Sequence, residues 1–184
     1  MISKFIKGFS LIELSIVIAL TGILFLFSFS FLSFFQNNQD QIIQKKILQA
    51  IQIAQLESMA KKTTIGICKS TNQKNCSGDW QHNQLIFIDG NHDGTIANRE
   101  SIVAVIKLNI KYGSLFWRSY PFYREYVAFL PNGTNDNGTF WFCLHGQAAP
   151  RFAITLNKAG ITHVLYPDKK GEITDKKGVL TCNG

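Results

Sequence analysis

The sequence predicts an α+β protein, in which one long N-terminal helix packs on an antiparallel, β-rich globular domain. Three observations support this fold class. Residues 9–35 form an apolar run in which Glu13 is the only formal charge. Apolar residues then recur at helical spacing up to about residue 54. After Lys62 the chain changes to short β-rich runs separated by turns.

The apolar run is long enough for a membrane helix. At about 1.5 Å per residue, residues 9–35 reach roughly 40 Å, whereas the hydrocarbon core of a bilayer is about 30 Å thick. We therefore expect a single-pass anchor at 9–35, with Lys4 and Lys7 holding the N-terminus in the cytoplasm and the rest in the periplasm. Because a carboxylate in the bilayer costs about 2.5–3.5 kcal/mol, Glu13 should have a partner and a function.

The second half of the helix, residues 36–62, is amphipathic. Polar residues 36–40 mark the exit from the membrane. One face then collects small and branched apolar side chains, namely Ile43, Ile47, Ala50, Ile51 and Ala54. The spacing predicts one continuous helix from Leu11 to Lys61 whose second half packs on the globular domain.

The globular domain, residues 63–184, is predicted to be a small antiparallel sandwich. Runs rich in β-branched and aromatic residues between turns predict seven strands, at Thr63–Cys68, Leu85–Ile88, Ile102–Ile110, Val127–Leu130, Thr139–Leu144, Phe152–Leu156 and Ile161–Tyr166.

Four cysteines suit an oxidising compartment, where they can form two disulfides in three alternative pairings. We favour Cys68–Cys76, which closes a short polar loop, and Cys143–Cys182, which ties the C-terminus to a strand. Their spacing does not fit the usual zinc patterns.

The segment Lys7-Gly8-Phe9-Ser10-Leu11-Ile12-Glu13-Leu14 resembles the type III leader of type IV pilins and type II secretion pseudopilins. The resemblance implies that residues 1–8 are a leader that a prepilin peptidase cuts after Gly8. It also implies N-methylation of the new terminus at Phe9. Glu13 would then pair with the terminal amine of a neighbouring subunit, and two opposite charges buried together in lipid cost less than one alone.

Later motifs resemble the GspH/FimT branch of minor pilins and minor pseudopilins. They are Ile67-Cys68-Lys69 with Cys76 and Trp80, Ile86-Phe87-Ile88-Asp89, Phe129-Leu130-Pro131-Asn132-Gly133, Phe140 to Cys143, and Ile154 to Gly160. The resemblance implies a pilin-like fold and a structural subunit, not an enzyme. Its partners would be other pilins or pseudopilins, the peptidase and an inner-membrane assembly platform.

Three roles follow from this resemblance: an initiator or tip subunit of a type IV pilus, a type II secretion pseudopilin, and a DNA-binding minor pilin for natural transformation. A membrane-anchored periplasmic enzyme is the alternative from another class. The four histidines form no recognisable triad and the sequence has no phosphate loop, which disfavours that alternative.

The net charge is +7, and without Lys4 and Lys7 of the leader it is 17 − 12 = +5, which permits an anionic partner such as DNA. The C-terminal cations that could contact it are Arg151, Lys158, Lys169, Lys170, Lys176 and Lys177. DNA-binding relatives carry arginines directly after the glycine that matches Gly160, whereas this chain has Ile161 and Thr162 there. The alternative is that these cations form a solvent-exposed basic face that binds no specific partner.

Residues 89–100 fit the calcium-loop pattern, with Asp89, Asn91, Asp93 and Glu100 at the ligand positions. The flanking residues look like strands, not the helices of an EF-hand, so a hairpin loop is the alternative. Apart from calcium, no cofactor is expected. Aromatic and arginine residues between 111 and 126 indicate a strand surface, a subunit contact or a platform for base stacking.

Overall fold

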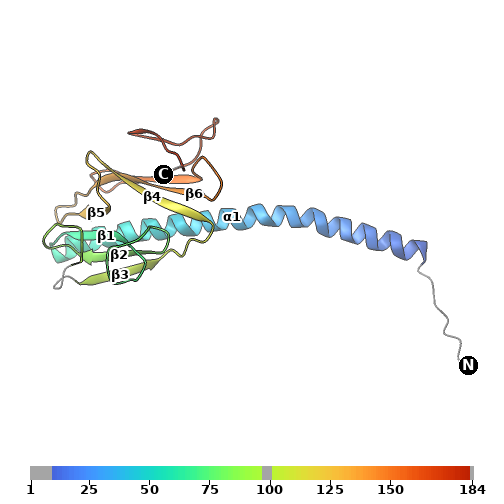
Figure 1. Ribbon diagram of the computed structural model, residues 1–184, viewed down its shortest axis with the longest axis horizontal. Helices are drawn as coiled ribbons and strands as arrows, with labels where there is room; N and C mark the ends of the chain where they lie inside the picture. Colours follow the sequence, from blue (N-terminus) through green and yellow to red (C-terminus); the bar gives the residue numbers. More distant parts are fainter. Residues whose placement is uncertain (1–9, 97–100, 183–184) are drawn as a thin grey trace, which may run out of the picture. The chain divides into compact units, whose positions relative to one another are not determined.

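The computed structural model describes residues 10–96 and 101–182, and within residues 26–38 it describes the backbone alone (Figure 1). One helix, α1, comprises Leu11–Lys61, which confirms the predicted bounds. Contacts divide the chain into two compact units, residues 1–41 and residues 42–184.

In the first unit, residues 11–41 are helical. Among the residues that the structure describes, no helix combines the length and the apolar character needed to cross a bilayer. Phe9 and the side chains of residues 26–35, which are part of the predicted span 9–35, lie outside the described residues.

The second unit holds two four-stranded antiparallel sheets and a short hairpin. The first sheet has the order β3-β2-β1-β5 and consists of β1 (Ile65–Ser70), β2 (Asn83–Ile88), β3 (Ile102–Lys107) and β5 (Tyr126–Phe129). The second has the order β4-β6-β7-β8 and consists of β4 (Gly113–Tyr120), β6 (Asn137–Leu144), β7 (Phe152–Leu156) and β8 (Thr162–Leu165). The hairpin pairs β9 (Thr174–Asp175) with β10 (Gly178–Val179). The predicted α+β class is confirmed.

The core of the second unit lies between α1 and both sheets. The five residues of the predicted apolar face are all buried, from Ile43 to Ala54. They share one cluster with Ile67 of β1, Ile86 of β2 and Phe140 of β6. The helix therefore supplies the third wall of a core that neither sheet could close alone.

The sequence-based prediction missed β4 in the second sheet and the short strands β9 and β10 of the hairpin. The residues of β4 alternate between buried and half-buried, with Leu115 and Trp117 in the core and Phe116 and Arg118 on the outer face. Aromatic residues occur on both faces, so the period of two expected for a half-buried strand is hard to see in the sequence.

The strand predicted at Ile102–Ile110 ends earlier, at Lys107. Asn109 has a positive φ of 52°, which a strand cannot contain. The backbone N–H groups of Leu108 and Asn109 both donate to the carbonyl of His82 instead of continuing the ladder.

Both favoured disulfides, Cys68–Cys76 and Cys143–Cys182, are present. The second one holds the C-terminal segment against the outer face of the β4-β6-β7-β8 sheet. There the indole N–H of Trp141 donates to the carbonyl of Thr181 at 3.1 Å. Ile173 and Leu180 pack in a cluster with Ala153 of β7.

The second unit has two ends along α1, and each end is marked by hydrogen bonds between α1 and the β domain. Near the start of the unit, the Tyr166 hydroxyl donates to the Gln44 side chain at 3.2 Å, and Lys46 Nζ donates to the Lys107 carbonyl at 2.5 Å. We call this the proximal end. Eleven residues after Gln44, the Gln55 amide donates to the Gly160 carbonyl at 2.9 Å, which marks the distal end.

Candidate assembly sites

The start of α1 is a capping box built from Ser10 and Glu13. The Ser10 backbone N–H donates to Glu13 Oε2 at 3.1 Å, and the Ser10 hydroxyl accepts from the N–H of Ile12 at 3.4 Å. Such reciprocal bonds satisfy donors that the first turn of a helix leaves free. The Glu13 carboxylate thus faces the amino end of its own helix, where a further amine would find an acceptor.

Gly8 and Phe9, the predicted cleavage and methylation sites, lie outside the described residues. The pairing of Glu13 with a neighbour's amine stays a prediction. The structure adds that Glu13 is exposed in the single chain and already bound to the backbone next to Phe9.

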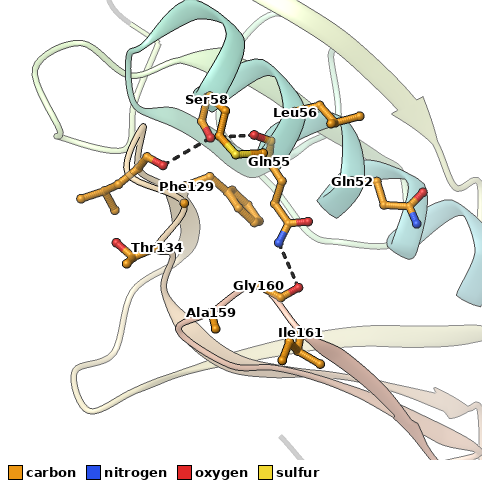
Figure 2. A pocket seen from close by; sticks show the side chains of 12 residues that line it. Gln52, Gln55, Leu56, Ser58, Phe129, Thr134, Ala159, Gly160 and Ile161 are labelled. Carbon is orange, nitrogen blue, oxygen red and sulfur yellow. Dashed lines mark hydrogen bonds between the residues drawn. The ribbon is translucent and has the colours of Figure 1, made fainter.

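A groove of ≈ 510 Å³ lies at the distal end between the last turns of α1, the turn after β5 and the turn between β7 and β8 (Figure 2). Its walls carry the exposed apolar side chains of Leu56, Met59 and Ile161. Apolar side chains that are exposed together in a groove make this surface a candidate for a protein contact.

Polar contacts hold this groove in shape. The Ser58 hydroxyl donates to the carbonyl of Gln55 at 2.8 Å and lies 3.4 Å from the carbonyl of Leu130 (Figure 2). Gly160 has φ +78°, and a Cβ there would collide with Gln55 Nε2. Only glycine fits this turn without displacing the Gln55 side chain.

The sequence-based prediction missed the groove. Leu56 and Met59 fall outside the buried stripe of α1, and this was the available signal. Ile161 and Thr162, which stand where DNA-binding relatives carry arginine, lie at this groove and directly after it.

The six cations predicted as DNA contacts do not form one cluster. Arg151 precedes β7 at the proximal end, and Lys169 and Lys170 follow Tyr166 there. Lys158 lies in the distal turn between β7 and β8. Lys177, next to Lys176, lies over the ring of Tyr120 with its Nζ 5.3 Å from the ring centroid.

In the calcium-like loop, side-chain oxygens are used within the loop itself. Asp93 Oδ1 accepts from the N–H and the hydroxyl of Thr95 at 2.7 and 2.8 Å, and Oδ2 accepts from Asn91 Nδ2 at 2.7 Å. These bonds, above all those from Thr95, hold the pKa of the Asp93 carboxyl below its ordinary value of 3.8.

The fourth ligand position of this loop, Glu100, lies outside the described residues. The buried Asp89 carboxylate accepts from the N–H of Gly94 at 3.4 Å. Within the described ranges, no group of three or more His, Cys, Asp or Glu side chains is arranged to hold a metal ion. Calcium binding stays a prediction of the sequence pattern.

The aromatic stretch between residues 111 and 126 divides between two environments. On the outer face of β4, Phe116 stacks on Trp141 at a centroid distance of 5.3 Å, and Arg118 lies over the same indole at 5.7 Å. In the following loop, Phe122 and Tyr123 are 76% and 68% exposed. Of these four residues from the stretch, the two in the loop are the ones most accessible to a partner.

An N-terminal helix with a capped acidic first turn, continuing into a two-sheet β domain, defines the class of type IV pilin-like proteins. The chain belongs to the GspH family, since residues 45–160 match the family described as Type II transport protein GspH. Residues 4–29 match the prokaryotic N-terminal methylation motif.

Solved structures share this fold. The minor pilin FimU of Pseudomonas aeruginosa is 21% identical, with a TM-score of 0.52 over 73% of this chain and 92% of its own. The minor pseudopilin EpsH of the Vibrio cholerae type II secretion system is 12% identical, with a TM-score of 0.51 over 72% of this chain and 96% of its own. No curated protein matches the chain by sequence.

Proposed function

We propose that this chain is a minor pilin or pseudopilin, a structural subunit that joins or initiates a pilus-like filament from the inner membrane. The methylation motif joined to a GspH-type domain carries this proposal. Residues 9–35 anchor the subunit, the leader is cut after Gly8, and the domain from residue 63 onward lies in the periplasm before assembly.

Glu13 sets the register between subunits in this proposal. Its carboxylate is held beside the backbone N–H of Ser10, one residue from the terminus that cleavage after Gly8 creates at Phe9. A neighbour's charged amine can compete for this carboxylate because an ammonium is a stronger donor than a neutral amide.

Among the roles of such a subunit, we favour a type IV pilus, with this chain at or near the tip. Two disulfides and the excess of basic residues suit a domain that is displayed in an oxidising exterior. DNA binding is not part of the proposal, since the six candidate cations are dispersed and the arginines after Gly160 are absent.

Replacement of Glu13 tests the proposal. We expect Glu13→Ala to leave leader cleavage and membrane association unchanged but to reduce incorporation into filaments at least about tenfold, because the neighbour's amine loses its partner. Incorporation is measured by immunoblot of sheared filaments against the membrane fraction. The control is Glu57→Gln, which removes a carboxylate that pairs with Lys61 at the far end of the same helix.

Normal incorporation of the Glu13→Ala variant would contradict the proposed contact. Incorporation into a secretion pseudopilus and not into surface pili would retain the class of protein but contradict the pilus assignment.

A further inference from the structure

Basic residues gather at the proximal end of the second unit. The clustering of basic residues follows from the strand pairing. At this end lie the last residues of β3, β6 and β8 and the first residues of β4 and β7. The cations are Lys45, Lys46, Lys107, Lys111, Arg151, Lys169 and Lys170, which we call the basic collar.

Contacts on the first sheet and α1 place one half of the collar. Lys46 Nζ donates to the carbonyl of Lys107, the last residue of β3. The chain then continues along the segment before β2, where the N–H of Ile110 donates to the carbonyl of Gln81. Lys111 follows directly.

Contacts on the second sheet place the other half. Gly113 at the start of β4 pairs with Leu144 at the end of β6, and the N–H of Arg151 donates to the carbonyl of Phe142. Tyr166 reaches Gln44, next to Lys45, and Lys169 and Lys170 follow three and four residues later. The Gln81 side chain lies 3.0 Å from Ser114 Oγ and so joins the two sheets at this end.

The charge of this end is unbalanced. The seven cations are accompanied in the same unit by the carboxylates of Asp79, Glu125, Asp168 and Glu172. Of these, Asp79 is bound to His82 at 2.8 Å and Glu125 to Lys69 at 3.0 Å. Within the part of the chain that the structure describes, none of the six collar lysines forms an ion pair, whereas other cations do, in the pairs Lys61–Glu57, Lys69–Glu125, Arg118–Asp175 and Arg124–Asp136.

We propose that the basic collar binds the anionic headgroups of the phospholipid bilayer that holds the N-terminal helix. This inference rests on the proposed membrane anchor. Ten residues separate Phe35 from Lys45, and as a helix they span about 15 Å. The headgroup layer occupies roughly 6 Å of that distance, so the helix length brings Lys45 within about one screening length of the lipid phosphates at physiological salt.

Several lysines acting together on one surface give the salt-sensitive attraction that polybasic segments have for anionic membranes. The collar would hold the domain close to the bilayer before assembly. Extraction of the subunit into a filament would release these contacts.

Amine labelling of the full chain in lipid nanodiscs tests the inference. Discs of phosphatidylcholine alone are compared with discs containing phosphatidylglycerol, and acetylation of each lysine is read by mass spectrometry. We expect Lys45, Lys169 and Lys170 to label about threefold more slowly in the anionic discs, and Lys61 and Lys158 to label equally in both. High salt should remove the difference.

Variants make the test specific. In Lys45→Gln/Lys169→Gln/Lys170→Gln, the anionic protection of Lys107 and Lys111 should fall by at least about half, because the remaining charges attract the surface less strongly. The matched distal variant, Lys61→Gln/Lys158→Gln/Lys176→Gln, should retain it. Equal loss in both variants would overturn the inference.

Other outcomes would also overturn it. Equal labelling in both kinds of disc would contradict the collar while leaving the anchor intact, whereas a chain that does not enter discs at all would contradict the anchor itself. Protection in phosphatidylcholine discs by millimolar inorganic phosphate, to the level seen with phosphatidylglycerol, would assign the collar to free anions. Stronger protection by duplex DNA than by anionic lipid would assign it to nucleic acid.

Discussion

Gly160 shows at the scale of one residue how a turn can shape a surface. Its φ of +78° and the close approach of Gln55 Nε2 to the place that a Cβ would occupy disfavour a side chain there, because the backbone would be strained and Gln55 would have to move. The Gln55 side-chain amide in turn donates to the Gly160 carbonyl. This hydrogen bond connects the turn between β7 and β8 to α1. The apolar groove depends on that attachment.

We therefore expect Gly160→Ala to lower the free energy of unfolding by about 1–3 kcal/mol, through backbone strain and displacement of Gln55. Gly133→Ala is the matched control, because Gly133 also has a positive φ, +82°, but open space around it. Urea denaturation of both variants separates strain from collision. Equal losses would mean that the contact with Gln55 contributes nothing.

Asp93 is the residue for which pH dependence can be predicted. Hydrogen bonds from Thr95 hold the pKa of its carboxyl below 3.8 in the folded chain, so the ionised form is the one that folding favours. This stability is fully present above pH 3.8 and is lost as the pH falls through the lower folded pKa.

We expect Asp93→Asn to lower the melting temperature at pH 6 but to have a smaller effect at about pH 2.5, where a larger fraction of the wild-type carboxyl is protonated. Thermal unfolding by circular dichroism at the two pH values measures this. An equal loss of melting temperature at both pH values would contradict the role of ionised Asp93. Repeating the pH 6 scan after chelation and with millimolar calcium tests the calcium pattern in the same loop.

At the scale of elements, the C-terminal hairpin and the segment after it cover one face of the β4-β6-β7-β8 sheet. Arg118 on β4 pairs with Asp175 at 2.5 Å, and Trp141 on β6 bonds to Thr181. The Cys143–Cys182 disulfide links this cover covalently to β6. The outer aromatic face of β4 is thereby partly covered, and its residues are half-buried.

The two disulfides should differ in their effect on stability. Cys143–Cys182 joins residues 39 apart and Cys68–Cys76 joins residues 8 apart. Loop-closure entropy then predicts losses of about 4 and about 2.5 kcal/mol on removal by paired Cys→Ala substitutions. Denaturant unfolding of the two double variants measures the difference, and a larger loss for the short loop would show that chain entropy does not govern it.

At the scale of the whole molecule, the core formed by the described residues lies within residues 42–184. Its buried apolar residues begin at Ile43 and end at Leu180 among the described residues. α1 is part of this unit from Ile42 onward, because its apolar face closes the core between the sheets.

A chain that begins at Ile42 should therefore fold cooperatively, with both disulfides formed and a sharp thermal transition in near-ultraviolet circular dichroism. A chain that begins at Leu56 is the control. It lacks the five buried residues from Ile43 to Ala54 and should fail to fold, since each such loss costs about 1–5 kcal/mol. Cooperative folding of the shorter chain would contradict the role given to α1.

The sequence by itself determined the local features. Helical periodicity predicted α1 from Leu11 to Lys61, the β-rich run at Phe152–Leu156 matches β7, and cysteine placement predicted both disulfides. The leader and Glu13 pointed to the family that the comparisons then showed. Such features depend on neighbours in the chain, so a period, a motif or a spacing is enough to reveal them.

Only the tertiary structure decided which surfaces remain for function. It divided the aromatic stretch between a partly covered sheet face and an exposed loop, and it formed a groove from residues as distant as Leu56 and Ile161. It also separated Lys158 from Lys169 and gathered the basic collar from distant connections. These outcomes depend on how antiparallel strands pair across long separations, and that pairing brings together residues whose proximity no local pattern records.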